Sequence, residues 1–186
     1  MAVPEFDAGP VAVRRIEPRA VVALRHLPGA ADLLAAALLA AGVTGIPSPG
    51  QALGFGQGQS AMAMWRSPTE VTMLAFDRPA ADAALNVLAA ADLACAVDLT
   101  DGTLALELQG PQVNDLLQRL VDSHSLPTHL GMVSRLRLVD IAVTLVRLQP
   151  DTLWLLADRG HAHYLALWLA HAGAALDQSQ RALNFG

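Results

Sequence analysis

The sequence contains no lysine, since all twelve basic residues among its 186 residues are arginine. This absence excludes a Schiff-base lysine and the phosphate-binding lysine of a P-loop. A single cysteine, Cys95, excludes a disulfide within the chain and is typical of a reducing compartment. No apolar run approaches the roughly 20 residues that span a bilayer, and residues 1–10 are unlike a secretory signal. We therefore expect a soluble, cytoplasmic protein that does not bind membranes.

Aromatic residues are also scarce, at 4% of the chain, whereas apolar residues make up 53%. This composition predicts an aliphatic core built of leucine, valine and alanine. The formal net charge is −5. Because proteins that bind nucleic acid without sequence preference need a basic surface, this charge argues against nucleic acid as a partner.

The stretch 97–120 carries the clearest local signals. Asp101-Gly102 predicts a turn, and leucines alternate with other residues over 104–108, which is typical of a strand with one buried face. Gly110-Pro111 ends that strand and favours a helix start. An apolar stripe at helical spacing follows, formed by Val113, Leu116, Leu117 and Leu120. The stretch therefore predicts a strand, a turn and an amphipathic helix.

Similar patterns recur along the chain. Two short strands are predicted within 11–27, further strands at 61–65, 71–76, 134–139, 141–148 and 153–157, and helices at 30–41, 77–91 and 158–172. Residues 71–91 and 152–172 share one plan: an apolar strand, Asp-Arg, a breaker and an amphipathic helix. This repeat predicts an α+β fold of duplicated β-α-β-β-α units, with antiparallel sheets and helices on one face of each.

The repeat also suggests domain boundaries. We expect a flexible N-terminal arm at residues 1–10, a first α+β half at 11–95 and a second half at 96–175. The last helix is predicted to stop at Gly173, and residues 176–186 form a polar tail.

Residues 44–60 form the chain's one long irregular segment, and 54–58 within it read G-x-G-x-G. A dinucleotide site needs G-x-G-x-x-G between a strand and a helix, whereas a strand is predicted after this cluster. A flexible loop is therefore favoured over a cofactor contact, and docking of the loop on a partner chain stays open.

The remaining reactive residues lack catalytic spacing. His161 and His163 are two apart on a predicted helix and cannot chelate one metal, and surface or capping roles are favoured for all six histidines. Cys95 lies in an apolar run without a second cysteine, which favours a buried structural thiol over a nucleophile. We assign no catalytic, cofactor-binding or metal-binding residue.

Several acids and tryptophans have two possible roles. Asp98 and Asp101 flank a turn, and turn chemistry explains them better than an acid–base pair. Asp140 interrupts an apolar run, where a hairpin corner is favoured over a carboxylate aimed into a folate site. Trp154 and Trp168 indicate core or interface packing, and an exposed aromatic would mark a partner site.

Three short motifs, in this order, resemble the gamma subunit of heterotetrameric sarcosine oxidase. Residues 65–70 (WRSPTE) resemble its W-x-G-P-x-E turn, residues 98–117 its D-x-[ST]-D-G … L-x-G-P-x-[AV]-x-[DN]-[LV]-L run, and residues 162–169 its A-x-Y-L-x-x-W-L helix. More distantly, the chain resembles the folate-binding fold of the glycine-cleavage T-protein. Ser67 replaces a usual glycine, Val71 stands where the family often has tryptophan, and the first 60 residues match weakly.

The resemblance implies a non-catalytic structural and assembly subunit of a flavoenzyme that oxidatively demethylates N-methyl amino acids such as sarcosine. It implies alpha, beta and delta subunits as partners. FAD, FMN, NAD and tetrahydrofolate are expected in those partners, with no cofactor in this chain. Whether the chain takes any direct part in the oxidoreductase chemistry stays open.

Two alternatives remain. The same fold could hold tetrahydrofolate, with Asp140 as the polarising group, in a T-protein-like aminomethyltransferase or a folate-binding protein. The chain could also be a stand-alone interaction module with unrelated partners.

Overall fold

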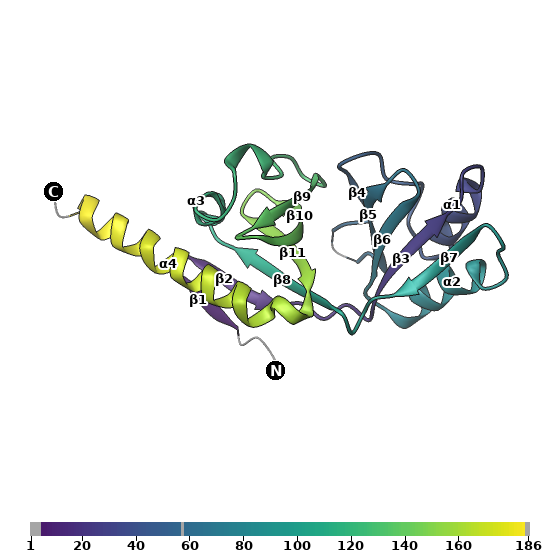
Figure 1. Cartoon of the computed structure of the whole chain (residues 1–186), viewed down its shortest axis with the longest axis horizontal. Helices are drawn as coiled ribbons and strands as arrows, with labels where there is room; N and C mark the ends of the chain where they lie inside the picture. The colour runs from purple at the N-terminus through teal and green to yellow at the C-terminus, as the bar shows by residue number, and fades with distance from the viewer. Residues whose placement is uncertain (1–4, 57, 185–186) are drawn as a thin grey trace. The chain divides into compact units, whose positions relative to one another are not determined.

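The computed structural model of the chain describes residues 5–56 and 58–184, with the side chains of 179–184 outside the description. The described residues form two compact units (Figure 1). Of the described residues, unit 1 draws on 5–16, 102–130 and 134–184, and unit 2 on 17–56, 58–101 and 131–133. The N-terminal strands therefore fold with the second half of the sequence.

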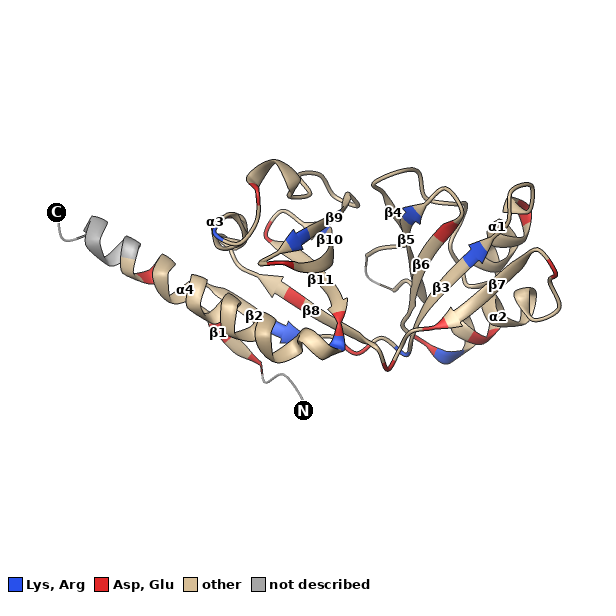
Figure 2. Ribbon diagram, viewed as in Figure 1, with Lys and Arg blue, Asp and Glu red and all other residues tan. Residues whose placement is uncertain are grey.

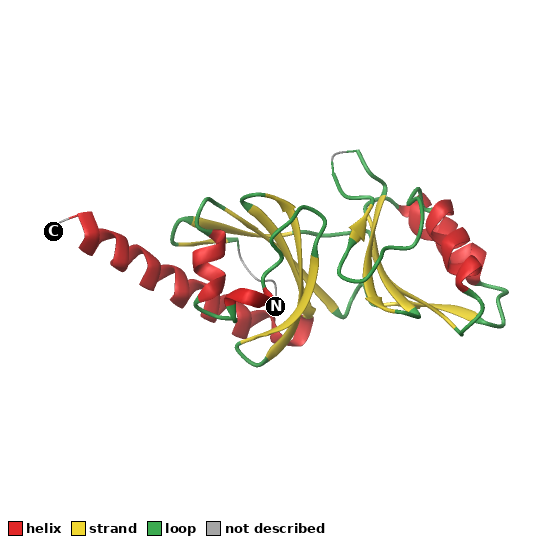
Figure 3. Ribbon diagram, turned by 90° about the horizontal axis from the view of Figure 1, so that it is seen from above, coloured by secondary structure: helices red, strands yellow, loops and turns green. Residues whose placement is uncertain are grey.

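Within the described residues, unit 2 is a five-stranded antiparallel sheet with two helices on one face (Figure 3). The sheet order is β4-β5-β6-β3-β7. Its strands are β3 (Ala20–His26), β4 (Ala52–Leu53), β5 (Ala61–Ser67), β6 (Glu70–Ala75) and β7 (Ala94–Asp98). The helices are α1 (Ala31–Ala40) and α2 (Arg78–Leu88).

The local chemistry of unit 2 follows the sequence patterns. Asp77 caps α2 by accepting a hydrogen bond from the Ala80 N–H at 2.8 Å, with Pro79 in the first turn. Gly42 follows α1 at φ +84, a conformation that glycine adopts without strain. Leu34 and Leu38 of α1 pack with Met73 and Val22 of the sheet, and these residues form an aliphatic core.

Unit 1, as far as it is described, is a six-stranded sheet with the order β1-β2-β8-β11-β10-β9. Its strands are β1 (Phe6–Ala8), β2 (Val11–Arg15), β8 (Thr103–Gln109), β9 (Val133–Leu138), β10 (Ile141–Gln149) and β11 (Thr152–Asp158). Two helices, α3 (Val113–Gln118) and α4 (Ala162–Asn184), lie on one face, and short 3₁₀ turns are η1 (Ser123–Ser125) and η2 (Arg159–His161).

The core of unit 1 confirms the predicted apolar stripes. Leu116 and Leu117 of α3 are fully buried, as is Leu106 of β8. They pack with Leu165 and Leu169 of α4 in one cluster. Helix α3 begins at Val113, so Pro111 precedes the helix instead of occupying its first position as the sequence predicted.

The sheet orders confirm the predicted duplication, but each repeat has one strand more than the predicted β-α-β-β-α unit. The repeated unit runs β3-α1-β4-β5-β6-α2 in unit 2 and β8-α3-β9-β10-β11-α4 in unit 1. In both sheets the first strand of the repeat pairs with its last strand, and the two hairpin strands lie beyond. Beside the first strand, unit 2 adds β7 and unit 1 adds β2. Strand β7 directly follows its repeat in the sequence, whereas β2 comes from the N-terminal end of the chain.

Both chain ends differ from the sequence prediction. Part of the expected arm, Phe6–Ala8, is strand β1, while residues 1–4 lie outside the described part. Helix α4 does not stop at Gly173 but continues to Asn184, so the expected tail is helical as far as it is described. The reason is packing: Leu176, beyond Gly173, is buried in the core of unit 1. The irregular segment 44–60 also contains the short strand β4.

Candidate functional site

A buried arginine, which the sequence patterns did not single out, organises a pocket of unit 1. Strand alternation points Val143 and Leu145 of β10 into the core, and Arg147 follows with the same parity. The Arg147 side chain is 4% exposed. A charged residue at a core-facing position of an apolar strand was the signal available in the sequence, because such residues are rarely buried without a specific reason.

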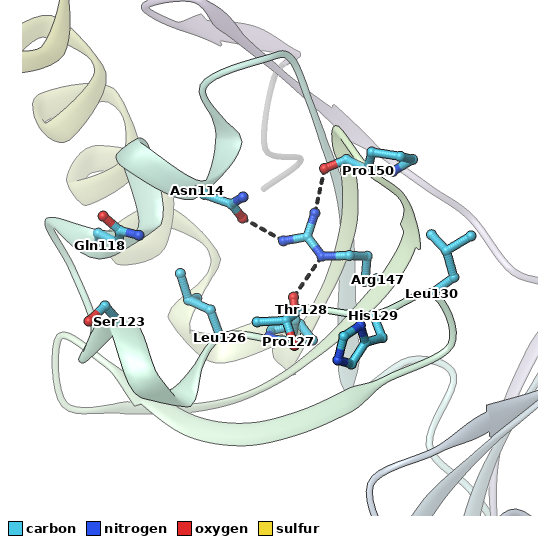
Figure 4. A pocket seen from close by; sticks show the side chains of 10 residues that line it. All are labelled: Asn114, Gln118, Ser123, Leu126, Pro127, Thr128, His129, Leu130, Arg147 and Pro150. Atoms are coloured by element: carbon cyan, nitrogen blue, oxygen red, sulfur yellow. Dashed lines mark hydrogen bonds between the residues drawn. The ribbon is translucent and has the colours of Figure 1, made fainter.

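The Arg147 guanidinium connects three segments (Figure 4). Its Nε donates to the Pro127 carbonyl and its Nη1 to the Pro150 carbonyl, both at 2.6 Å. Its Nη2 donates to Oδ1 of Asn114 in α3, and a longer bond of 3.5 Å joins Nη1 to the Gln149 carbonyl. The side chain therefore fixes α3, the 126–130 loop and the β10–β11 turn to one another.

The pocket beside Arg147 has a volume of about 400 Å³. It is lined mainly by polar side chains and prolines, namely Asn114, Gln118, Ser123, Leu126, Pro127, Thr128, His129, Leu130, Arg147 and Pro150. Burial lowers the pKa of the Arg147 guanidinium from its ordinary value. Among the described residues, no hydrogen bond joins Ser123 to His129, so the pocket offers charge and hydrogen-bond donors but no assembled nucleophile and base.

The predicted candidates do not converge on this pocket. His129 lines it, whereas the glycine cluster, Cys95 and Asp140 lie elsewhere. Gly54 and its neighbours join β4 to β5, so a strand follows the cluster as predicted, and the geometry of a dinucleotide fingerprint is not met. Gln57, in the middle of the cluster, lies outside the described residues.

The prediction of a buried Cys95 is wrong. Cys95 is exposed on β7, an edge strand of unit 2, because its neighbour Ala94 takes the buried face of that strand. Cys95 also lines a second pocket of about 350 Å³, together with Arg25 and Glu70. Glu70 accepts a hydrogen bond from Nε of Arg25 at 2.9 Å and forms an ion pair with Arg66 at 3.0 Å. These ion pairs hold one end of the 65–70 turn, which is the first of the three family-like motifs.

The aspartates have the turn roles that the sequence favoured. Asp98 accepts from the Thr100 side-chain and backbone donors at 2.6 and 2.8 Å, and these bonds hold the pKa of Asp98 below its usual value. Asp140 lies exposed at the β9–β10 corner at φ +70, after Val139 at φ +45. Its carbonyl accepts a hydrogen bond from Arg137 at 2.8 Å. Asp140 is therefore a hairpin corner.

Helix α4 presents a second apolar surface opposite its buried side. The surface residues follow helical spacing and are Tyr164, Leu167, Trp168 and His171, which we name the α4 stripe. Leu167 is 57% exposed, Tyr164 41% and Trp168 36%. Figure 2 shows no charged residue on α4 between Ala162 and Leu176. Trp154, in contrast, is half-buried and its indole donates to Glu107 across the sheet at 3.1 Å.

The described residues contain neither a metal-binding cluster nor a membrane-spanning helix. No group of three or more histidine, cysteine, aspartate or glutamate side chains has the proximity needed to hold a metal ion within residues 5–56 and 58–184. Over the same part of the chain, every helix is too short or too polar to cross a bilayer.

Comparison with known proteins places the fold. No protein-family model matches the sequence, and no curated protein matches it. A chain of the heterotetrameric sarcosine oxidase from Corynebacterium sp. U-96 is similar in structure, with a TM-score of 0.79 and 22% identity, over 93% of this chain and 89% of that one.

Aminomethyltransferase T of the glycine cleavage system from Bartonella henselae is also similar, with a TM-score of 0.61 and 17% identity. The match covers 87% of this chain but 45% of that enzyme, so this chain corresponds to less than half of the enzyme's length. At sequence identities of 22% and 17%, the structural similarity shows the fold alone. This chain has the T-protein-like α+β fold found in a chain of heterotetrameric sarcosine oxidase, as the three sequence motifs predicted.

Proposed function

We propose that this chain is a non-catalytic assembly subunit, equivalent to gamma, of a heterotetrameric sarcosine oxidase-like flavoenzyme. The observation that carries the proposal is the match to one chain of such an enzyme over nearly the whole of both chains. A match of that extent argues for an equivalent unit of the assembly, whereas the match to aminomethyltransferase T covers only part of that enzyme.

The α4 stripe supports the proposal. A helix on the surface of a monomer normally carries polar residues on its outer face, whereas here Tyr164, Leu167 and Trp168 are exposed together. The rings of Tyr164 and Trp168 lie 6.2 Å apart in an edge-to-face arrangement. Aromatic residues of this kind are enriched at protein interfaces, so the stripe suits contact with a partner subunit.

In this proposal the chemistry belongs to the partner subunits. FAD, FMN, NAD and tetrahydrofolate are held by the alpha and beta subunits, with delta completing the heterotetramer. The substrate is an N-methyl amino acid such as sarcosine, and the assembly is cytoplasmic.

Co-expression with flavoprotein subunits, which the proposal expects to be encoded beside this gene, tests the proposal. The chain is expected to co-purify with them in fixed stoichiometry and to contain no flavin when it is purified alone. Flavin bound to the isolated chain, or oxidation of sarcosine without partners, would contradict the proposal.

A matched pair of variants tests the role of the α4 stripe. Leu167→Glu is expected to weaken assembly at least tenfold while leaving the isolated chain folded, because Leu167 is 57% exposed. Leu39→Glu, at a residue of α1 that is 62% exposed, is the control and should assemble normally. Equal assembly of both variants would remove the stripe from the interface.

The tetrahydrofolate alternative has no specific support from the position of Asp140. Its carboxylate belongs to an exposed hairpin corner, and turn geometry accounts for the residue. Titration of tetrahydrofolate into the isolated chain decides the matter. Micromolar binding that Asp140→Ala abolishes would favour the alternative.

A further inference from the structure

We infer that the pocket beside Arg147 is a binding site for a carboxylate group, supplied by a free small acid or by a polypeptide. The inference depends on the Arg147 guanidinium, its hydrogen bonds and the residues around it. It does not depend on the proposed assembly role, because unit 1 alone forms the whole pocket.

The first argument is the missing counter-charge. The Arg147 side chain is 4% exposed, yet every acceptor bonded to it is a neutral carbonyl or amide oxygen. No carboxylate among the described residues forms an ion pair with it. The nearby acids are used elsewhere: Asp122 accepts from the His124 N–H and Asp151 accepts from the Thr152 hydroxyl. Removing an unpaired charge from water is costly, and a bound anion would offset that cost.

The second argument is the remaining donor capacity. A guanidinium has five N–H groups in a rigid fork. The structure gives Nε one acceptor and Nη1 two acceptors, whereas Nη2 has only Asn114 Oδ1. One Nη2 N–H therefore lacks an acceptor among the described residues. Because the other bonds hold the fork in place, this donor needs no reorganisation when an anion arrives.

The third argument is the surrounding chemistry. A pocket of about 400 Å³ is of the size that takes a small ligand. Besides Arg147, its wall carries the Ser123 hydroxyl, the Gln118 amide and the His129 ring, and none of the described residues that line it is acidic. These groups can donate hydrogen bonds to a second oxygen, and none repels a negative charge. A carboxylate is the planar anion whose geometry suits an arginine fork.

The simplest competing explanation is that Arg147 serves only as a clamp for α3 and the two loops. A variant that supplies an internal carboxylate separates the two explanations. Asn114→Asp keeps the shape of the residue that accepts from Nη2 but adds the missing negative charge. If the pocket binds a carboxylate, this internal one competes with it, whereas a pure clamp binds no carboxylate in either form.

The experiment uses the full chain labelled with ¹⁵N at constant ionic strength. Sodium acetate replaces sodium chloride in one series, and in the other a glycine tripeptide with a free C-terminal carboxyl is compared with its amide. The Arg147 Nε–H resonance and the backbone amides of residues 126–130 are followed by NMR. We expect saturable shifts there, weakened at least tenfold by Asn114→Asp and unchanged by Asn86→Asp on exposed α2, the control for added charge.

Each outcome decides the inference. Saturation by acetate identifies a free acid as sufficient, and saturation only by the tripeptide with a free carboxyl identifies a polypeptide source. If either response is lost in Asn114→Asp but kept in Asn86→Asp, the site is supported. Absence of a saturable response to both probes, or a response that Asn114→Asp leaves intact, overturns it.

Discussion

Gly173 of helix α4 lies directly against Ala8 of strand β1. A Cβ atom on Gly173 would stand 2.6 Å from the Ala8 Cα and 2.5 Å from its carbonyl oxygen, which is closer than any real Cβ contact. The neighbouring Gly9 adopts φ +61 and packs against the Gly173 carbonyl. Gly173, which the sequence predicted to end the last helix, is therefore the point where α4 and the edge strand β1 meet.

Gly173→Ala should destabilise unit 1 by about 1–3 kcal/mol, because the added methyl must push α4 away from β1. This figure is the net loss, after the gain of about 1 kcal/mol that alanine gives in a helix interior. Urea denaturation followed by circular dichroism measures the change. A more stable variant would mean that helix propensity dominates and that the contact is loose.

Arg147→Met should destabilise the chain by about 2–4 kcal/mol. The apolar side chain fits the buried position but leaves the Pro127 and Pro150 carbonyls without their donor. Arg14→Met, at an exposed position of β2, is the control and should change stability by less than about 0.5 kcal/mol. Equal denaturation midpoints for the two variants would show that the clamp contributes nothing.

The Asp77 cap should make unit 2 less stable in acid. The Ala80 N–H and the Ser60 hydroxyl hold the pKa of Asp77 below its ordinary value of 3.8. The pKa of Asp77 is lower in the folded chain than in the unfolded chain. The contribution of Asp77 to stability is therefore complete above pH 3.8 and is lost as the pH falls through the folded pKa. Asp77→Asn keeps the acceptor without titrating, so its denaturation midpoint should converge with that of the unmodified chain at low pH. Asp77→Ala should lie below both at neutral pH.

Asp140→Gly should stabilise the β9–β10 hairpin by about 0.5–1 kcal/mol, since glycine adopts φ +70 without steric cost. Asp151→Gly is the matched control at the β10–β11 turn, where φ is not positive and added chain freedom should destabilise. Thermal denaturation of both variants gives the comparison. A destabilised Asp140→Gly would reveal a function of the Asp140 side chain that turn geometry does not explain.

The sequence predicted most of the elements because their signals are local. The alternating leucines of 104–108 became β8, and the Asp77 cap with Pro79 became the start of α2. The repeat of the Asp-Arg pattern correctly indicated two similar units, since Asp158 also caps its helical turn by accepting from Gly160 at 2.7 Å. These outcomes follow from hydrogen bonds and side-chain periodicity within a few residues.

The candidate site was not predictable in the same way. Arg147 meets Asn114, which is distant in sequence, and its burial depends on how α3 and the 126–130 loop fold over β10. Cys95 was predicted to be buried from its apolar neighbours, whereas its exposure depends on β7 being a sheet edge. The alternation along β10 marks Arg147 as core-facing, but neither its partners nor the exposure of Cys95 is visible in a local pattern.

By itself, then, the sequence determined where strands, helices and turns form, and that the chain is a duplicated α+β protein. The tertiary structure alone decided that residues 6–15 pair into the sheet of unit 1 and that α4 continues past Gly173. It also decided that Arg147 is enclosed without a carboxylate partner among the described residues. The physical reason is range: propensity and capping act over a few residues, whereas burial, close backbone approach and counter-charge depend on segments that meet only in the folded chain.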